Sequence, residues 1–176
     1  MKLNGIERET FLEHFTFDFE NGKVYWKKGR IGVTIGAEAG SITVHGYRSL
    51  RLFRVPIFAH RLIYWMYYKI DITGKEIDHR NKDKADNSIS NLRLCSRKQN
   101  CRNLSPTNNN ATGFRNISLH GSNDPKRTTY YHANIKKGGK RVYSKFFPYT
   151  PEGLEQAKIA VLNARKKHFG EYSGDN

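Results

Sequence analysis

Three polar residues near the middle of the chain have the types and spacing that hydrolysis of a phosphodiester requires. Asp78 and His79 are adjacent, and Asn100 follows within the same polar stretch, 71–103. A carboxylate and an amide oxygen suit a hard divalent cation. Histidine titrates near neutrality and can activate water. A cation beside the scissile phosphate would stabilise charge on the phosphoryl oxygen and on the leaving 3′ oxygen.

The elements that must position these residues are short. We expect a strand ending at 77–79, a second strand at 92–95 and a helix over 96–104. Adjacent residues of a strand point to opposite sides. Asp78 and His79 can therefore serve one site only if the local backbone re-aims one of them.

The spacing also resembles a known family. Asp78-His79, eleven residues, Asn91-Leu92-Arg93 and then Asn100 resemble the motif of HNH homing endonucleases, particularly those of phage introns. Residues 59–63 resemble the element that leads into this motif, so the resemblance covers about 44–104. It implies a ββα-metal core, in which two strands and a helix hold one divalent cation. Mg²⁺ is the expected physiological ion, and Mn²⁺ is expected to substitute.

The same resemblance implies roles by position. Asp78 and Asn100 would ligate the metal, His79 would be the general base, and Asn91 would orient the His79 ring. Many members of the family carry His where this chain has Asn100. The implied activity is site-preferring DNA cleavage by a homing-type endonuclease of a phage or mobile element. The alternative is a DNA-binding regulator with a non-catalytic HNH-like segment, and an RNA-binding protein is a third reading.

Four further residues are open to more than one interpretation. Asn87 lies in a polar loop, where asparagine usually serves turn formation. His60 either contacts DNA or ties a helix to a strand, and we favour the structural role. The spacing of Cys95 and Cys101 matches no common zinc pattern, which favours plain thiols.

The rest of the first half predicts small elements rich in aromatic residues. A short helix over 6–15 precedes a hairpin at 17–26, whose Asn21-Gly22 pair tolerates positive φ in a tight turn. Extended structure at 41–58 leads into a helix at 60–68 that is apolar on several sides. The expected fold is α+β with four segments: a helix and hairpin region at 1–43, the nuclease core at 44–104, a linker at 105–110 and a DNA-binding module at 111–172.

The carboxy-terminal module predicts three strands, at 113–119, 130–136 and 140–147, followed by an amphipathic helix. Thr150 can cap this helix and Pro151 suits its first turn. The order of elements resembles an AP2 DNA-binding domain, which implies that the sheet reads the major groove of duplex DNA. Strict alternation would place the polar side chains on one face of the sheet. The candidate DNA contacts are Arg115, Asn134, Lys136, Arg141, Tyr143 and Lys145.

Composition agrees with a nucleic-acid partner. The 176 residues include 31 Lys and Arg against 16 Asp and Glu, a net charge of +15, spread along the chain. Distributed cations gain affinity for phosphates through counterion release. No apolar run approaches the roughly 20 residues that span a bilayer, and residues 1–9 do not form a secretory signal. We therefore expect an intracellular, cytoplasmic protein that binds double-stranded DNA, with no membrane and no protein partner evident.

Overall fold

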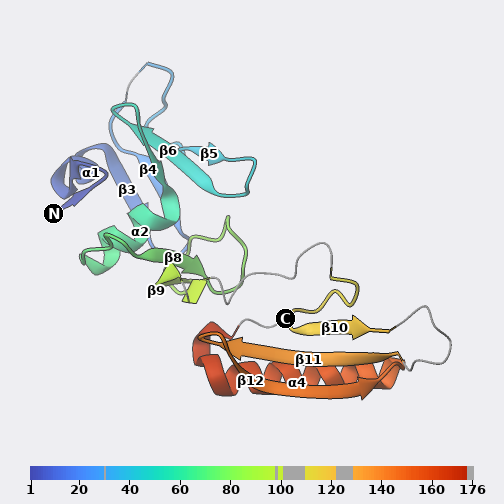
Figure 1. Ribbon diagram of the computed structural model, residues 1–176. Coiled ribbons are helices and arrows are strands. Elements are labelled where there is room, and N and C mark those ends of the chain that lie inside the picture. Colours follow the sequence, from blue (N-terminus) through green and yellow to red (C-terminus); the bar gives the residue numbers. More distant parts are fainter. Residues whose placement is uncertain (30, 98, 101–109, 122–128, 174–176) are drawn as a thin grey trace. The chain divides into compact units, whose positions relative to one another are not determined.

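The chain folds as two compact units, Met1–Lys98 and Gln99–Asn176, which the colours of Figure 1 follow from blue to red. Each unit has a hydrophobic core of its own. No helix in the described part of the chain is long and apolar enough to cross a membrane. This computed structural model describes residues 1–29, 31–97, 99–100, 110–121 and 129–173.

The first unit consists of short antiparallel strand pairs and two helices. Its three-stranded sheet has the order β5-β6-β7, and its other strands form two-stranded ladders. In chain order the elements are β1 (Lys2–Leu3), β2 (Ile6–Glu7), α1 (Arg8–His14), β3 (Phe15–Asp18), β4 (Lys23–Trp26), β5 (Ser41–Ile42), β6 (Arg48–Leu52), β7 (Val55–Phe58), α2 (Ala59–Tyr68), β8 (Glu76–His79) and β9 (Leu92–Cys95).

The predicted amino-terminal hairpin is confirmed as β3 and β4, paired from Phe15↔Trp26 to Asp18↔Lys23. The turn uses Gly22 at φ +65°. A Cβ on Gly22 would lie 2.1 Å from the backbone carbon of Asn87. This glycine therefore supplies a positive φ, and its missing side chain also lets the hairpin touch the loop between β8 and β9.

Helix α2 is the centre of the first core, as its composition predicts. Leu62, Ile63, Trp65 and Met66 are buried, and so is His60. A helix that is apolar on several sides must be covered on several sides, and α2 contacts β4, β6, β7, β8 and β9. The strand pair β8–β9 is thus fixed to the core through α2.

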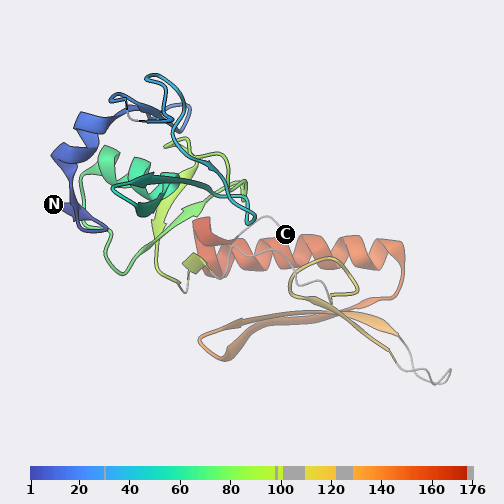
Figure 2. The same cartoon turned by 90° about the horizontal axis from the view of Figure 1, so that it is seen from above.

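The second unit is a three-stranded antiparallel sheet of order β10-β11-β12 with a long helix on one face (Figure 2). Thr150 Oγ1 accepts the N–H of Gly153, so the predicted cap of that helix is confirmed. The predicted start of the first strand at 113 is wrong, because Gly113 and Asn116 adopt positive φ in a turn. The elements are β10 (Ile117–His120), β11 (Tyr130–Lys137), β12 (Lys140–Pro148), α4 (Pro151–Phe169) and the 3-10 turn η1 (Gly170–Tyr172).

A β-bulge changes which side chains share a face of this sheet. Ile135 pairs with Tyr143 while Lys136 pairs with Arg141, so Val142 is an extra residue on β12. Such a bulge shifts the alternation by one residue. Tyr143, opposite Ile135, packs on the helix side, and Lys145 is opposite Ala133 on that side.

The prediction that Asn134, Lys136, Arg141, Tyr143 and Lys145 share one face is therefore wrong. The first three lie on the side away from α4, and the last two lie toward it. We define the outer face as the side of the sheet away from α4. The register assigns to it Ser118, His120, Tyr130, His132, Asn134, Lys136, Arg141, Ser144 and Phe146.

Candidate active site

The strand pair β8–β9 carries the predicted catalytic dipeptide. The register pairs Asp78 with Arg93 and His79 with Leu92. Ile77 and Leu92 belong to the first core, which explains why this short polar segment forms strands at all. Asp78 and His79 are both buried, at 7% and 4% exposure. The two functional side chains thus sit at a fixed strand end, each with its own set of partners.

Asp78 forms a buried ion pair with Arg93. Nε and Nη2 of Arg93 donate to Asp78 Oδ2 at 2.9 and 2.7 Å, and Arg93 is 5% exposed. A carboxylate has two oxygens with about four acceptor positions. The two bonds therefore orient the Asp78 carboxylate without using all its acceptor capacity. From sequence, Arg93 is recognised as part of the motif without a role of its own.

The His79 ring is held by Asn87, which sequence analysis assigned to turn chemistry. His79 Nε2 lies 3.1 Å from Asn87 Oδ1, and Asn87 Nδ2 donates to the carbonyl of Ala85 at 3.2 Å. The amide nitrogen is thereby turned away from the ring, which assigns the Nε2 proton to His79 and the Oδ1 acceptor to Asn87. In a neutral ring with this tautomer, the lone pair is on Nδ1.

Asn91 makes different contacts from the one predicted for it. Its Oδ1 accepts the N–H of Asn81 at 3.0 Å, and its Nδ2 donates to the carbonyl of Asp86 at 2.8 Å. Both bonds close the loop between β8 and β9. The ring contact predicted for Asn91 is made by Asn87, and any catalytic role of Asn91 stays a prediction.

Two aromatic rings lie close to the ring of His79. The rings of His60 and Tyr47 lie 5.1 and 6.0 Å from it, centroid to centroid. Lys84 ties the loop to the same region, because its Nζ lies over the Tyr47 ring at 4.9 Å and donates to the carbonyl of His45. These contacts restrict the ring of His79.

His60, one of the two rings beside His79, is neutral. Burial, with smaller contributions from the charges of His79 and Arg61, lowers its pKa to about 3. Its Nδ1 is buried without a hydrogen-bond partner in the described part of the chain. His60 therefore carries no charge at neutral pH, in keeping with the structural role favoured from sequence.

Apart from Cys95, the remaining predicted residues lie outside the β8–β9 pair. Asn100 is helical and half-buried, and it falls within the second unit; its role as a metal ligand stays a prediction. Arg115 lies in the turn before β10. Cys95 is a free, buried thiol whose pKa is raised to about 11, mainly by burial. It is therefore protonated and unreactive at neutral pH. Cys101 and most of the predicted linker 105–110 lie outside the described residues.

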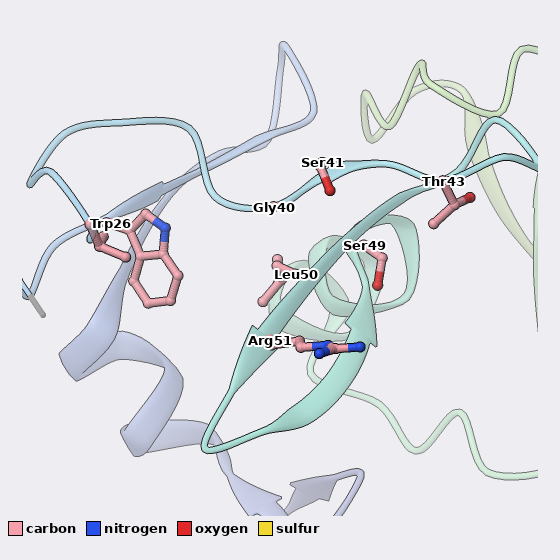
Figure 3. Close-up of a pocket in the computed structure, with 8 residues that line it drawn as sticks. Trp26, Gly40, Ser41, Thr43, Ser49, Leu50 and Arg51 are labelled. Carbon is pink, nitrogen blue, oxygen red and sulfur yellow. The ribbon is translucent and has the colours of Figure 1, made fainter. Parts of the chain in front are cut away.

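A separate pocket of the first unit has no acid–base chemistry of its own. It is open to solvent, has a volume of about 500 Å³, and holds Arg51 as its only charged side chain (Figure 3). None of the predicted site residues lines it. Its lining consists of Trp26, Val33, Gly40, Ser41, Thr43, Ser49, Leu50 and Arg51.

The strand pair β8–β9 lies in a segment that matches a known protein family. Residues 58–102 match the family model described as HNH endonuclease, and no curated protein and no solved structure matches the chain. The matched range begins at the last residue of β7 and includes α2, β8, the loop and β9. The chain thus carries an HNH endonuclease domain, which indicates nuclease activity on DNA. The match is narrower than the predicted range of 44–104.

The contacts of the two loop asparagines lead to a matched pair of predictions. Asn87→Ala should lower the cleavage rate, because the His79 ring loses the acceptor that fixes its tautomer; losses of about 10- to 100-fold are usual for such partners. Asn91→Ala should mainly lower stability, by about 1–3 kcal/mol, because the two hydrogen bonds that close the loop are lost.

Rates and thermal unfolding midpoints of both variants separate these effects. Asn87→Asp, which keeps the acceptor oxygen, should retain more activity than Asn87→Ala. Equal cleavage by Asn87→Ala and the wild type would contradict the assigned contact.

Proposed function

We propose that this protein is a site-preferring DNA endonuclease of the homing type, with His79 as general base and one divalent metal. The observation that carries the proposal is the coincidence of the HNH match with a buried strand pair on which Asp78 and His79 are each fixed by a dedicated partner. A charged pair and an oriented imidazole at one strand end suit acid–base chemistry.

We propose that one divalent cation binds at Asp78, because a carboxylate and an amide oxygen are suitable donors for it. Mg²⁺ is commonly bound by one or two carboxylates, waters and substrate phosphates. In the described part of the chain, no three or more His, Cys, Asp or Glu residues lie close enough together to hold a metal ion by themselves. Mg²⁺ does not require such a group. Asp78, with Asn100 as the proposed second oxygen donor, would hold the ion, and Mg²⁺ is the proposed species with Mn²⁺ as substitute. When bound, the cation supplies stabilisation of negative charge on the phosphate oxygens.

The chain's own residues supply the other functions. Asn87 keeps the Nε2 proton on His79, so Nδ1 accepts the proton of the attacking water. The aromatic wall of Tyr47 and His60 restricts the ring and limits the access of bulk water to it. Arg93 keeps the Asp78 carboxylate in place. We propose that the second unit is an AP2-like module that binds duplex DNA, with Arg115, Asn134, Lys136 and Arg141 among its contacts.

A second candidate function is a DNA-binding regulator with a non-catalytic HNH segment. The observation that favours it is the Asp78–Arg93 pair, since an ion pair of this kind can be wholly structural. In that case the strand pair would stabilise the fold, and the charge of the chain would serve DNA binding alone.

Incubation of the full chain with supercoiled plasmid distinguishes the two functions. With Mg²⁺ or Mn²⁺ we expect nicked circles as the first product, because one HNH site cuts one strand in each engagement; with EDTA the plasmid should stay supercoiled. Plasmid that is bound but remains intact at every metal concentration would favour the regulator.

Metal dependence tests the two proposed ligands. Asp78→Asn and Asn100→Ala should each raise the metal concentration for half-maximal cleavage by about tenfold or more, because each removes an oxygen donor or its charge. Asp78→Asn keeps an acceptor oxygen for Arg93 but removes the counter-charge of a buried guanidinium, so the thermal unfolding midpoint of this variant is measured together with its metal dependence. An unchanged midpoint in a variant removes that residue from the ligand set.

A further inference from the structure

Four aromatic side chains on the outer face of the second unit form one cluster, in which each ring contacts two others. His120 stacks on Tyr130 at 5.7 Å, and His132 stacks on Phe146 at 4.5 Å. Edge-to-face contacts join these two pairs, at 5.0 Å between Tyr130 and Phe146 and at 5.3 Å between His120 and His132. We name these four residues the ring platform.

The ring platform is exposed to solvent at Phe146 and His120, whereas Tyr130 is half-buried and His132 is 8% exposed. Phe146 is 59% exposed. The core of this unit lies on the opposite face, where α4 covers Ala133 and Ile135. Cross-strand ring pairs stabilise a sheet, but stability alone does not require a phenylalanine in water. Contiguous apolar side chains on a polar surface mark interaction sites.

The surroundings of the platform are basic. Lys136 and Arg141 lie on the same face, toward the Gly138-Gly139 turn, and both are exposed. Strands β10, β11 and β12 contain no Asp or Glu. Flat rings on a face that also carries exposed cations complement a ligand with planar apolar groups on a negatively charged backbone.

We propose that the outer face of the second unit binds single-stranded DNA, with unpaired bases stacked on the ring platform and phosphates on Lys136 and Arg141. Duplex DNA presents only base edges in its grooves, and polar side chains read these. Unpaired bases offer their faces, and aromatic rings on a sheet bind those faces. Burial, together with the charges of His120 and Arg141, lowers the pKa of His132, so its buried ring supports Phe146 from below as a neutral imidazole at pH 7.

This proposal rests on the second unit being a DNA-binding module and assigns its outer face to a single strand in preference to a duplex, but it is independent of the proposed nuclease chemistry. The binding site belongs to another unit of the chain, and EDTA, which prevents metal-dependent cleavage, leaves it intact. Failure of cleavage and failure of single-strand binding are therefore separate results.

The test measures binding of the full chain in EDTA to three fluorescent 15-mers: oligo(dT), an abasic oligomer with the same phosphates, and a blunt duplex. The wild type should bind oligo(dT) more tightly than the abasic strand. Phe146→Ala and Tyr130→Ala should each weaken oligo(dT) binding by about 5- to 150-fold, the usual effect of losing one base stack. Affinity for the abasic strand should be unchanged, and Phe146→Trp should restore binding of oligo(dT).

Two controls separate stacking from charge and from general exposure. Tyr149→Ala removes a ring of similar exposure, 56%, that contacts Tyr131 on the helix side, and it should bind like the wild type. Lys136→Ala and Arg141→Ala should weaken binding of oligo(dT) and of the abasic strand alike, and each should reduce the salt slope by about 0.7.

Three outcomes would overturn the proposal. The wild type could bind the abasic strand as tightly as oligo(dT), which would leave phosphate attraction alone. Phe146→Ala and Tyr130→Ala could bind oligo(dT) like the wild type. Finally, the two variants could lose duplex binding to the same extent as single-strand binding, which would make the outer face a duplex-binding surface.

Discussion

His79→Ala is expected to cut DNA about 10²- to 10⁴-fold more slowly than the wild type, the usual contribution of a general base. His79 Nε2 lies 3.1 Å from Asn87 Oδ1, so Nδ1 is the proposed proton acceptor. Alanine removes this acceptor and leaves Asp78 and its partner Arg93 in place. Affinity for DNA, measured in EDTA, should be nearly unchanged because His79 is buried.

The variant leaves a buried asparagine without its ring partner, so stability must be measured together with rate. His79→Gln provides a second test, since its amide can donate to Asn87 but cannot act as a base; it should be as slow as His79→Ala. Imidazole added to the buffer should partly restore cleavage by His79→Ala, which a merely structural histidine would not permit. His45→Ala, an exposed histidine in the neighbouring turn, serves as the matched control. Cleavage by His79→Ala at the rate of His45→Ala would refute the assigned role.

Local rules predicted most elements of the fold, because each depends on a few adjacent residues. The Asn21-Gly22 turn and the Thr150 cap are confirmed by the structure. The strand pair β8–β9 was also expected, since Ile77 and Leu92 supply its apolar positions. In each case the deciding interaction is between residues near one another in the chain.

The partner of His79 depends instead on the three-dimensional course of a loop. Asn87 and Asn91 have the same side chain in the same polar segment, and composition does not separate them. The loop is held by Lys84 on Tyr47 and by the backbone bond from Ile89 N–H to the carbonyl of Phe19. These contacts join segments far apart in the sequence, and they turn Asn87 toward the ring.

The faces of the second sheet show the same limit of local reasoning. Strict alternation assigns Arg141 and Tyr143 to one side, yet the bulge at Val142 separates them. Val142 and Tyr143 both pack toward the helix, so burial of two apolar groups favours the irregular register. A sequence does not mark such a bulge when neither neighbouring residue is glycine. The ring platform was missed for the related reason that His120 and Phe146 come from strands far apart in the chain.

Arg93→Ala is expected to lower the free energy of unfolding of the first unit by about 3–5 kcal/mol, because removal of one partner leaves the other charge buried and unpaired. Asp78 is 7% exposed, so water does not readily replace the guanidinium. Both tryptophans, Trp26 and Trp65, are buried in this unit. Their fluorescence during denaturation by urea therefore reports unfolding of the unit that contains the ion pair.

Controls separate the ion pair from the general effects of an arginine substitution. Arg51→Ala, at an exposed position of β6, should change the free energy by less than about 0.5 kcal/mol. Arg93→Lys keeps the charge but not the two-pronged geometry, so it should lie between Arg93→Ala and the wild type. The double variant Asp78→Ala/Arg93→Ala should be more stable than the sum of the single effects predicts, by about 1–3 kcal/mol, as expected for groups in contact. Additive single effects, or an Arg93→Ala protein as stable as Arg51→Ala, would mean that Asp78 is held by other contacts and that Arg93 does not position it.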